Sequence, residues 1–526
     1  MPRVLVSDRL AEDGLEILRR EAEVDLRLGL SPADLIEIIP DYQALVVRSE
    51  TKVTLEVIDA GRELIVIGRA GVGVDNIDVE AATRRGVVVV NAPEGNTIAA
   101  AEHTIALMLA LARHVPAAHA SLSQGKWERS KFVGIELRGK TLGLIGLGRV
   151  GSEVARRARG LEMNVLAFDP FVSPERAQTL GIRLTEKADL LSQSDFISLH
   201  VPLTADNRNL LGEDEFKIVK PDARVINVAR GGLIDEAALL RAIDNGRVAG
   251  AAVDVFDPEP PAPDLPLLSH RAVIVTPHLG ASTAEAQERV AVDVANQVLA
   301  VLRGEPAIYA VNLPVVAAEA FKVIAPYQQA ATQAASLATQ LSTGQFEGVE
   351  IEYLGELADL ELTPLKASVI KGLLAPVSEE NVTLVNAGII AEQRGLRITE
   401  RKGHYDGIYK DLIRVNLMTS GGRTSVSATV AHDGPHIVEI NDFWVDVAPA
   451  TGYLLLCENV DRPGMIGAIG TFLGSKDINI SFMRVGREAV RGRALMVLGL
   501  DDELDAETLT EIGRIPNIFS ARVARI

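Results

Sequence analysis

Short apolar runs separated by helix-length segments are the feature that most restricts the fold of this chain. Between residues 141 and 278, six runs rich in β-branched residues are expected to be strands: 141–146, 164–169, 196–202, 223–230, 250–256 and 272–278. Near-continuous apolar runs are typical of parallel strands that are buried on both faces by helices. The pattern predicts an α/β fold with a doubly wound parallel (Rossmann) sheet, in which ligands bind beyond the carboxyl ends of the strands.

The same alternation occupies the first hundred residues. Expected strands lie at 4–8, 44–49, 64–70 and 87–93, and a long helix is expected over 96–114. A second helix, expected over 285–303, has valines at helical spacing and could return the chain to this N-terminal part. Residues 453–526 have the order strand, helix, strand, strand, helix, strand, which is typical of a ferredoxin-like unit.

A glycine motif marks the first turn of the Rossmann pattern. Gly146, Gly148 and Gly151 lie between an expected strand and an expected helix, where the backbone can approach a pyrophosphate and the helix N-terminus attracts it. Asp169 ends the next strand, 18 positions after Gly151, and would accept hydrogen bonds from a ribose diol and repel a 2′-phosphate. The spacing predicts NAD rather than NADP; an ordinary glycine-rich turn is the alternative for the motif alone.

Polar residues follow three of the expected strands at their carboxyl ends. Arg230 follows an apolar run, and its two-pronged guanidinium suits a substrate carboxylate. His278 is a candidate general acid and base, and a nearby Glu259 would hold its ring and favour its protonated form. Each residue alone could be structural or solvated, but together they predict transfer of a hydride and a proton at a carbonyl. We expect the other histidines, such as His103, to be structural.

Composition excludes several classes of protein. A formal net charge of −18 opposes a general nucleic-acid or anionic-membrane binder. The single cysteine, Cys457, excludes an internal disulfide and a multi-cysteine zinc site, so we expect no metal and a reducing compartment. The longest apolar run, 98–112, is interrupted by Glu102 and His103, and the N-terminus reads as a strand rather than a signal peptide. These features predict a soluble, cytoplasmic protein.

Five blocks resemble the D-isomer-specific 2-hydroxyacid dehydrogenases. They are GRAGVGVDNID (68–78), WERSKFVGIELRGKTLGLIGLGRVG (127–151), NVARGGLIDE (227–236), DVFDPEPP (254–261) and TPHLGAST (276–283). The resemblance implies catalytic roles for Arg230, Glu259 and His278. It also implies cofactor contacts at Gly146, Gly148, Arg149, Val150, Gly151, Asp169, Val201, Val228, Ala229, Arg230, Asp254, His278, Leu279, Gly280 and Ala281.

The resemblance is strongest to the long members of this family, which oxidise 3-phosphoglycerate to 3-phosphohydroxypyruvate at the start of serine synthesis. Such a substrate needs local positive charge for its phosphate, and the candidates are Arg48, Arg69, Arg129 and Lys131. Arg48 and Arg69 fall at strand ends of the N-terminal part. Arg129 and Lys131 could instead belong to a solvated charged loop.

The C-terminal segment 457–480 resembles an ACT regulatory domain. Asp461 and Asn479 stand at positions that bind serine in related enzymes, whereas Asn459 replaces a tyrosine found in some relatives, so the effector stays open. An ACT fold that only assembles subunits is the alternative, and the family implies a homotetramer. The resemblance divides the chain into a flavodoxin-like substrate domain (1–97 with 285–312), an NAD-binding domain (98–284), an α/β intervening regulatory domain (313–450) and a ferredoxin-like ACT domain (451–526).

Two other functions remain open at this point. A dehydrogenase for an unphosphorylated acid, such as glycerate or glyoxylate, would share the glycine motif and the three catalytic candidates. The carboxyl-terminal-binding corepressors use the same fold as NADH-sensing interaction proteins without catalysis. The ACT-like tail and the additional arginines favour the phosphorylated substrate.

Overall fold

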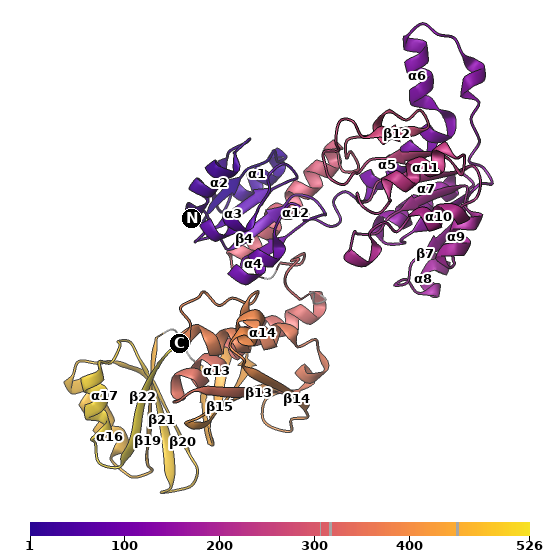
Figure 1. The fold of residues 1–526 in the computed structure, drawn as a ribbon. Helices are drawn as coiled ribbons and strands as arrows, with labels where there is room; N and C mark the ends of the chain where they lie inside the picture. Colours follow the sequence, from indigo (N-terminus) through magenta and orange to yellow (C-terminus); the bar gives the residue numbers. More distant parts are fainter. Residues whose placement is uncertain (306, 315–317, 449–451) are drawn as a thin grey trace.

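The computed structural model describes residues 1–305, 307–314, 318–448 and 452–526 (Figure 1). Within these ranges four sheets follow one another, with five, seven, six and four strands. The first two are parallel, the third is mixed and the fourth is antiparallel. This arrangement confirms the predicted fold class.

The N-terminal sheet has the strand order β2-β1-β3-β4-β5, which is the flavodoxin-like order. Its strands are β1 (Arg3–Val6), β2 (Glu23–Leu26), β3 (Ala44–Val47), β4 (Val66–Arg69) and β5 (Val88–Val90). Its connecting helices are α1 (Glu12–Arg19), α2 (Pro32–Ile38), α3 (Leu55–Ala60) and α4 (Val79–Arg85). Strand β2 was not predicted, because this edge strand has the polar sequence EVDL and lacks a buried apolar run.

Helix α12 (Ala284–Leu302) follows the last strand of the cofactor sheet in the sequence, but it packs on the N-terminal sheet. Its residues Val290, Val294 and Val298 belong to the same buried cluster as Val4 and Val6 of β1. The helix therefore connects the two parallel sheets, as Figure 1 shows.

The cofactor sheet has the order β12-β11-β10-β9-β6-β7-β8, which contains the Rossmann order around β6. Its strands are β6 (Thr141–Ile145), β7 (Asn164–Phe168), β8 (Arg183–Leu184), β9 (Phe196–Leu199), β10 (Ala223–Asn227), β11 (Val248–Val253) and β12 (Val273–Val275). Its helices are α5 (Thr97–Arg113), α7 (Arg149–Gly160), α8 (Pro174–Thr179), α9 (Lys187–Gln193), α10 (Glu213–Ile218) and α11 (Glu236–Asp244). The strands after β8 end earlier than predicted, and the polar residues that follow them lie in loops.

Helix α6 (Val115–Ser123) bends away from α5 by 62° and projects from the cofactor domain (Figure 1). The projecting arm, residues 115–133, consists of α6 and the segment that follows it, and it exposes several large apolar side chains, namely Val115, Leu122, Trp127 and Val133. In the described part of the chain, no single helix is long and apolar enough to cross a membrane, although α5 and α6 together meet that length and composition.

The C-terminal part contains the mixed sheet and the antiparallel sheet. The mixed sheet is formed by β13 (Phe346–Gly355), β14 (Arg397–Gly403), β15 (Asp411–Thr419), β16 (Gly422–Ala431), β17 (Gly434–Ile440) and β18 (Phe443–Val447), with helices α13 (Ala318–Leu341), α14 (Thr363–Leu374) and α15 (Ala387–Gln393). The last unit is β19 (Tyr453–Val460), α16 (Met465–Ser475), β20 (Ile480–Arg487), β21 (Arg493–Leu500), α17 (Ala506–Gly513) and β22 (Ile518–Arg525). This is the predicted ferredoxin-like order, and the boundary expected at 450/451 lies outside the described residues.

The contact between α12 and β4 leads to a prediction about stability. A Cβ atom at Gly68 of β4 would lie 2.6 Å from a methyl of Val298 and 2.8 Å from a methyl of Val294. We expect Gly68→Ala to lower the free energy of unfolding by about 1–3 kcal/mol, because the helix must move to admit the methyl. Urea unfolding checks this, with Gly160→Ala as control, since a Cβ there meets nothing within 4 Å. Equal stability of the two variants would contradict the packing.

Candidate active site

The glycine loop between β6 and α7 forms an open cradle. Gly146 has φ +99°, and a Cβ there would lie 2.5 Å from the carbonyl oxygen of His200. A Cβ at Gly151 would collide with the carbonyl oxygen of Gly146, so the turn and the helix are in close contact. At Gly148, by contrast, a Cβ would meet nothing within 4 Å. The space beside Gly148 and the free N–H groups that begin α7 fit a pyrophosphate.

Asp169 lies directly after β7 and beside this loop. Its Oδ2 accepts a hydrogen bond from the Leu147 N–H at 2.8 Å, and its Oδ1 accepts one from the Phe171 N–H at 2.9 Å. A carboxylate has further lone pairs, so both oxygens can still accept from a ribose diol. The arrangement therefore fits the adenosine end of a dinucleotide.

The other residues implied for the cofactor lie at the same edge of the sheet. Arg149 and Val150 begin α7, and Arg149 pairs with Glu94 at 3.1 Å. The remainder follow the carboxyl ends of β9, β10, β11 and β12: Val201, Val228, Ala229, Arg230, Asp254, His278, Leu279, Gly280 and Ala281. Because neighbouring parallel strands end together, these positions lie at one edge of the sheet, and Arg230, His278 and Ala281 line a cleft there.

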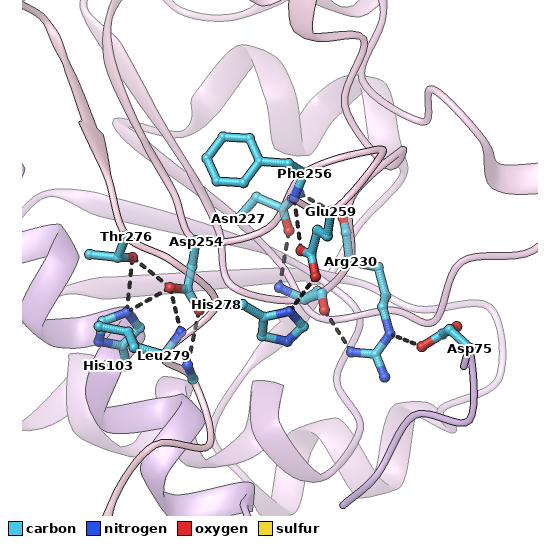
Figure 2. A network of polar contacts seen from close by, with 12 residues as sticks. Asp75, His103, Asn227, Arg230, Asp254, Phe256, Glu259, Thr276, His278 and Leu279 are labelled. Carbon is cyan, nitrogen blue, oxygen red and sulfur yellow. Dashed lines mark hydrogen bonds and ion pairs between the residues drawn. The ribbon is translucent and has the colours of Figure 1, made fainter. Parts of the chain in front are cut away.

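Asp254 organises the loop that carries His278 (Figure 2). Its side chain is fully buried, and its Oδ1 and Oδ2 accept the N–H groups of Leu279 at 2.8 Å and Gly280 at 2.9 Å. Its main-chain oxygen accepts the N–H of His278 at 2.8 Å. Burial by itself would raise the pKa of Asp254, but hydrogen bonds from His103, Thr276 and Leu279 bring the pKa below its usual value.

His278 and Glu259 form a hydrogen-bonded pair. His278 Nδ1 lies 2.7 Å from Glu259 Oε2, and Glu259 Oε1 accepts the Phe256 N–H at 3.0 Å. Burial alone would raise the pKa of Glu259, but its hydrogen bonds with His278 and the Phe256 N–H lower the pKa below the ordinary value. Glu259 is therefore an acceptor at neutral pH, so His278 donates through Nδ1 and its Nε2 is left for a ligand.

In Figure 2, Arg230 lies on the opposite side of His278 from Asp254. Its Nη1 donates to the carbonyl oxygen of Ala229 at 2.7 Å, and its Nε lies 3.4 Å from Asp75 Oδ2. Asp75 belongs to the loop between β4 and α4, so this contact joins the cofactor domain to the N-terminal domain. The three side chains predicted to be catalytic, Arg230, Glu259 and His278, lie near one another (Figure 2).

A cleft of about 560 Å³ contains all three of these side chains together with two further arginines, Arg48 and Arg69. Arg48 follows β3, and Arg69 ends the neighbouring strand β4. Burial and the neighbouring charge of Arg230 lower the pKa of Arg69 to about 10, and its Nε has no hydrogen-bond partner among the described residues. The three guanidinium groups outnumber the two carboxylates that line the same cleft, Asp75 and Glu259, and the buried Nε of Arg69 is a donor that an anion could satisfy.

Two of the predicted phosphate ligands lie elsewhere. Arg129 and Lys131 are exposed in a short 3₁₀ helix, Arg129–Phe132, within the projecting arm, and neither lines the cleft. Lys131 instead pairs with Glu128 at 2.7 Å. Helix α6 carries their segment away from the N-terminal sheet, and in this chain the pair lies in an exposed charged loop, the alternative left open by the sequence. Their role as phosphate ligands stays a prediction.

The predicted effector residues both have partners inside the ACT domain. Asp461, after β19, accepts the Arg491 N–H at 3.0 Å and lies 3.3 Å from Arg487 Nη1. Asn479, before β20, donates to Asp501 at 2.6 Å. Asn459 is buried, and its Oδ1 has no hydrogen-bond partner within the described ranges.

His103, which the sequence analysis placed among the structural histidines, has partners in the His278 loop that the sequence did not predict. Its Nε2 lies 3.2 Å from Asp254 Oδ1 and 3.3 Å from Thr276 Oγ1. The only hint of such a contact in the sequence is a histidine within a mostly apolar helix. In the structure this helix, α5, packs against β10, β11 and β12.

Three family models match successive parts of the chain. The NAD binding domain of D-isomer specific 2-hydroxyacid dehydrogenases matches residues 105–280. The D-3-phosphoglycerate dehydrogenase intervening domain matches residues 323–441, and the ACT domain matches residues 453–517.

Similar proteins extend over the whole chain. The D-3-phosphoglycerate dehydrogenase of Synechocystis sp. is 46% identical, covering 100% of this chain and 95% of the relative. Those of Archaeoglobus fulgidus and Bacillus subtilis are 44% and 43% identical, with 99% of both chains covered in each case.

Solved structures resemble the first two domains. A glyoxylate reductase from Paecilomyes thermophila is 31% identical with a TM-score of 0.54, covering 59% of this chain and 98% of that one. D-lactate dehydrogenase from Aquifex aeolicus, complexed with NAD and lactic acid, is 28% identical with a TM-score of 0.53, covering 59% and 99%. The chain is therefore a nicotinamide-dependent oxidoreductase that belongs to the D-isomer-specific 2-hydroxyacid dehydrogenases, in the branch of D-3-phosphoglycerate dehydrogenases with an intervening domain and an ACT domain.

Proposed function

We propose that this protein catalyses the NAD-dependent oxidation of 3-phosphoglycerate to 3-phosphohydroxypyruvate, the first step of L-serine biosynthesis. The observation that carries the proposal is one cleft with both an acid–base pair and three guanidinium groups, those of Arg48, Arg69 and Arg230. The relatives that share the whole chain are named for the same substrate. A dehydrogenase for an unphosphorylated acid would leave Arg48 and Arg69 without a ligand.

Charge balance supports a substrate with two anionic groups. Arg230 adjoins His278 and offers a two-pronged donor, so it would bind the carboxylate next to the reacting carbon. Arg48 and Arg69 lie on the N-terminal domain and would bind the phosphate at the other end of the substrate. A phosphate would also give the buried Nε of Arg69 the acceptor that it lacks among the described residues.

His278 and Glu259 would move the proton. In the oxidation, Nε2 of neutral His278 accepts the proton of the substrate hydroxyl, while the C–H bond breaks and the C=O double bond forms. A nicotinamide bound at this edge of the sheet would supply the acceptor for the hydride released from that carbon. Glu259 accepts from Nδ1 throughout, which orients the ring and stabilises the imidazolium that forms. The reduction of the oxo acid uses the same groups in reverse.

Asp169 supports NAD as the cofactor. Its carboxylate lies next to the glycine loop and would repel a 2′-phosphate, while its oxygens can accept from an unmodified ribose. The Gly148 cradle would hold the pyrophosphate, and the buried Asp254 would lie next to the nicotinamide end of the crevice.

Assembly and regulation complete the proposal. The apolar side chains of the projecting arm would be buried in a homotetramer, and the ACT domain would bind serine near Asp461 and Asn479 as a feedback effector. The chain would comprise a substrate domain (1–97 with 285–312), an NAD-binding domain (98–284), an intervening domain (313–450) and an ACT domain (451–526). The regulatory part is tested by measuring the rate of 3-phosphohydroxypyruvate reduction with and without added serine.

Replacing His278 tests the proton transfer. We expect His278→Asn to lower kcat by about 100- to 10,000-fold, because the general acid and base is lost. Asparagine suits this position because His278 has φ +53°, a left-handed conformation that asparagine tolerates. The Kd for NADH, measured by fluorescence, should change by less than about threefold, as the cradle is untouched. His404→Asn, an exposed position elsewhere, is the control; a variant at position 278 with wild-type kcat would remove His278 from the reaction.

The substrate assignment is tested by comparing two oxo acids. The wild-type protein should reduce 3-phosphohydroxypyruvate with a higher kcat/KM than hydroxypyruvate. In Arg69→Gln, kcat/KM for the phosphorylated acid should fall by about 10- to 100-fold, the value of a charge-assisted hydrogen bond, while that for hydroxypyruvate changes little. Arg138→Gln, an exposed position outside the cleft, is the matched control. A wild-type preference for hydroxypyruvate would contradict the proposed function, and an equal loss with both acids would contradict the phosphate role of Arg69.

A further inference from the structure

The loop that carries His278 has an uncommon backbone. His278 is a non-glycine residue with φ +53°, which is stable only when the surroundings fix it. Three successive N–H groups, from His278, Leu279 and Gly280, donate to Asp254, one to its carbonyl oxygen and two to its carboxylate. The direction of the His278 ring therefore depends on the Asp254 carboxylate.

Two side chains, those of Thr276 and His103, also form hydrogen bonds with the Asp254 carboxylate. The Thr276 hydroxyl donates to Asp254 Oδ1 at 2.5 Å, and His103 Nε2 lies 3.2 Å from the same oxygen (Figure 2). The hydroxyl uses its only hydrogen on Asp254, and an ionised carboxylate has none to give. His103 Nε2, which is also 3.3 Å from the hydroxyl oxygen, must therefore carry a hydrogen and donate it to this pair.

We propose that His103 is a positioning residue of the reaction: its Nε2–H keeps the Asp254 carboxylate ionised and oriented, so that the loop holds His278 against Glu259. His103 acts through Asp254 and touches none of the reacting atoms. The role in catalysis rests on the proposed function, but the hydrogen-bond network itself does not.

The groups around Asp254 explain why such a donor matters. The side chain of Asp254 is fully buried, and the negative charge of Glu259 opposes its ionisation. His103 from α5, Thr276 after β12 and the two loop N–H groups favour ionisation. A protonated Asp254 would present a hydrogen to one of the N–H groups of Leu279 or Gly280, and the loop would lose that contact.

The first test is the pH dependence of kcat/KM for reduction of 3-phosphohydroxypyruvate. The fall in kcat/KM at acid pH (the acid limb) reports groups, such as the Asp254 carboxylate, that must be deprotonated for activity. We expect His103→Leu to move the midpoint of this limb upward by about one pH unit, since it removes one donor to a buried carboxylate. His103→Gln should keep the wild-type midpoint, because its amide nitrogen can replace Nε2. Thr276→Val, which removes only the hydroxyl, should shift the limb in the same direction. His404→Leu, the same change at an exposed site, should leave it unmoved.

The second test needs no cofactor and no turnover. The native pKa of Asp254 lies below its ordinary value, so its ionised form stabilises the fold above that value, and this stability is lost as the pH falls through the native pKa. The thermal unfolding midpoint of cofactor-free His103→Leu should therefore begin to fall at a higher pH than that of His103→Gln.

The proposal is overturned if His103→Leu reduces the rate by one constant factor at every pH and its unfolding profile parallels that of His103→Gln. It is also overturned if His103→Gln behaves like His103→Leu in both tests. A wild-type protein inactive towards 3-phosphohydroxypyruvate would contradict the proposed function, while the unfolding comparison would still decide whether His103 supports Asp254.

Discussion

The hydrogen bonds that Asp254 accepts from three successive residues, His278 to Gly280, are the interaction on which the active-site geometry depends. They fix a left-handed backbone at His278 and place its Nδ1 2.7 Å from Glu259. Glu259 follows β11, whereas His278 follows the neighbouring strand β12, so two adjacent strand ends set the position of the acid–base pair. The sheet supplies the rigidity that the loop lacks, which is how loop residues on a parallel sheet can be catalytic.

The second constraint is electrostatic. An acidic chain, with 71 acidic and 53 basic residues, gathers three guanidinium groups in one cleft, and it buries one of them without an acceptor for Nε among the described residues. Grouped like charges lower stability, and the carboxylate and phosphate of the proposed substrate would bring negative charge to them. The cleft is formed by loops of two domains joined through Arg230 and Asp75, so substrate binding would also hold the domains together.

The fold was largely predictable because its buried strands are continuous apolar runs, and the glycine motif with Asp169 identified the cofactor edge. The polar edge strand β2 and the two-residue strand β8 lack that signal. Periodicity gives the face of a helix but not its partner, so the contact of His103 with Asp254 could not be predicted. The same limitation applies to Arg129 and Lys131, whose distance from the cleft depends on the 62° bend between α5 and α6.

The central claim is that the Glu259–His278 pair moves the proton of the reaction. It is tested most directly by measuring kcat and KM in both directions for the wild-type protein and Glu259→Gln. We expect kcat to fall by about 10- to 1,000-fold for oxidation and for reduction alike, because His278 loses the carboxylate that orients its ring and stabilises the imidazolium. The substrate KM should change little, since Glu259 is not proposed to contact the substrate. A variant with wild-type kcat in both directions would contradict this claim.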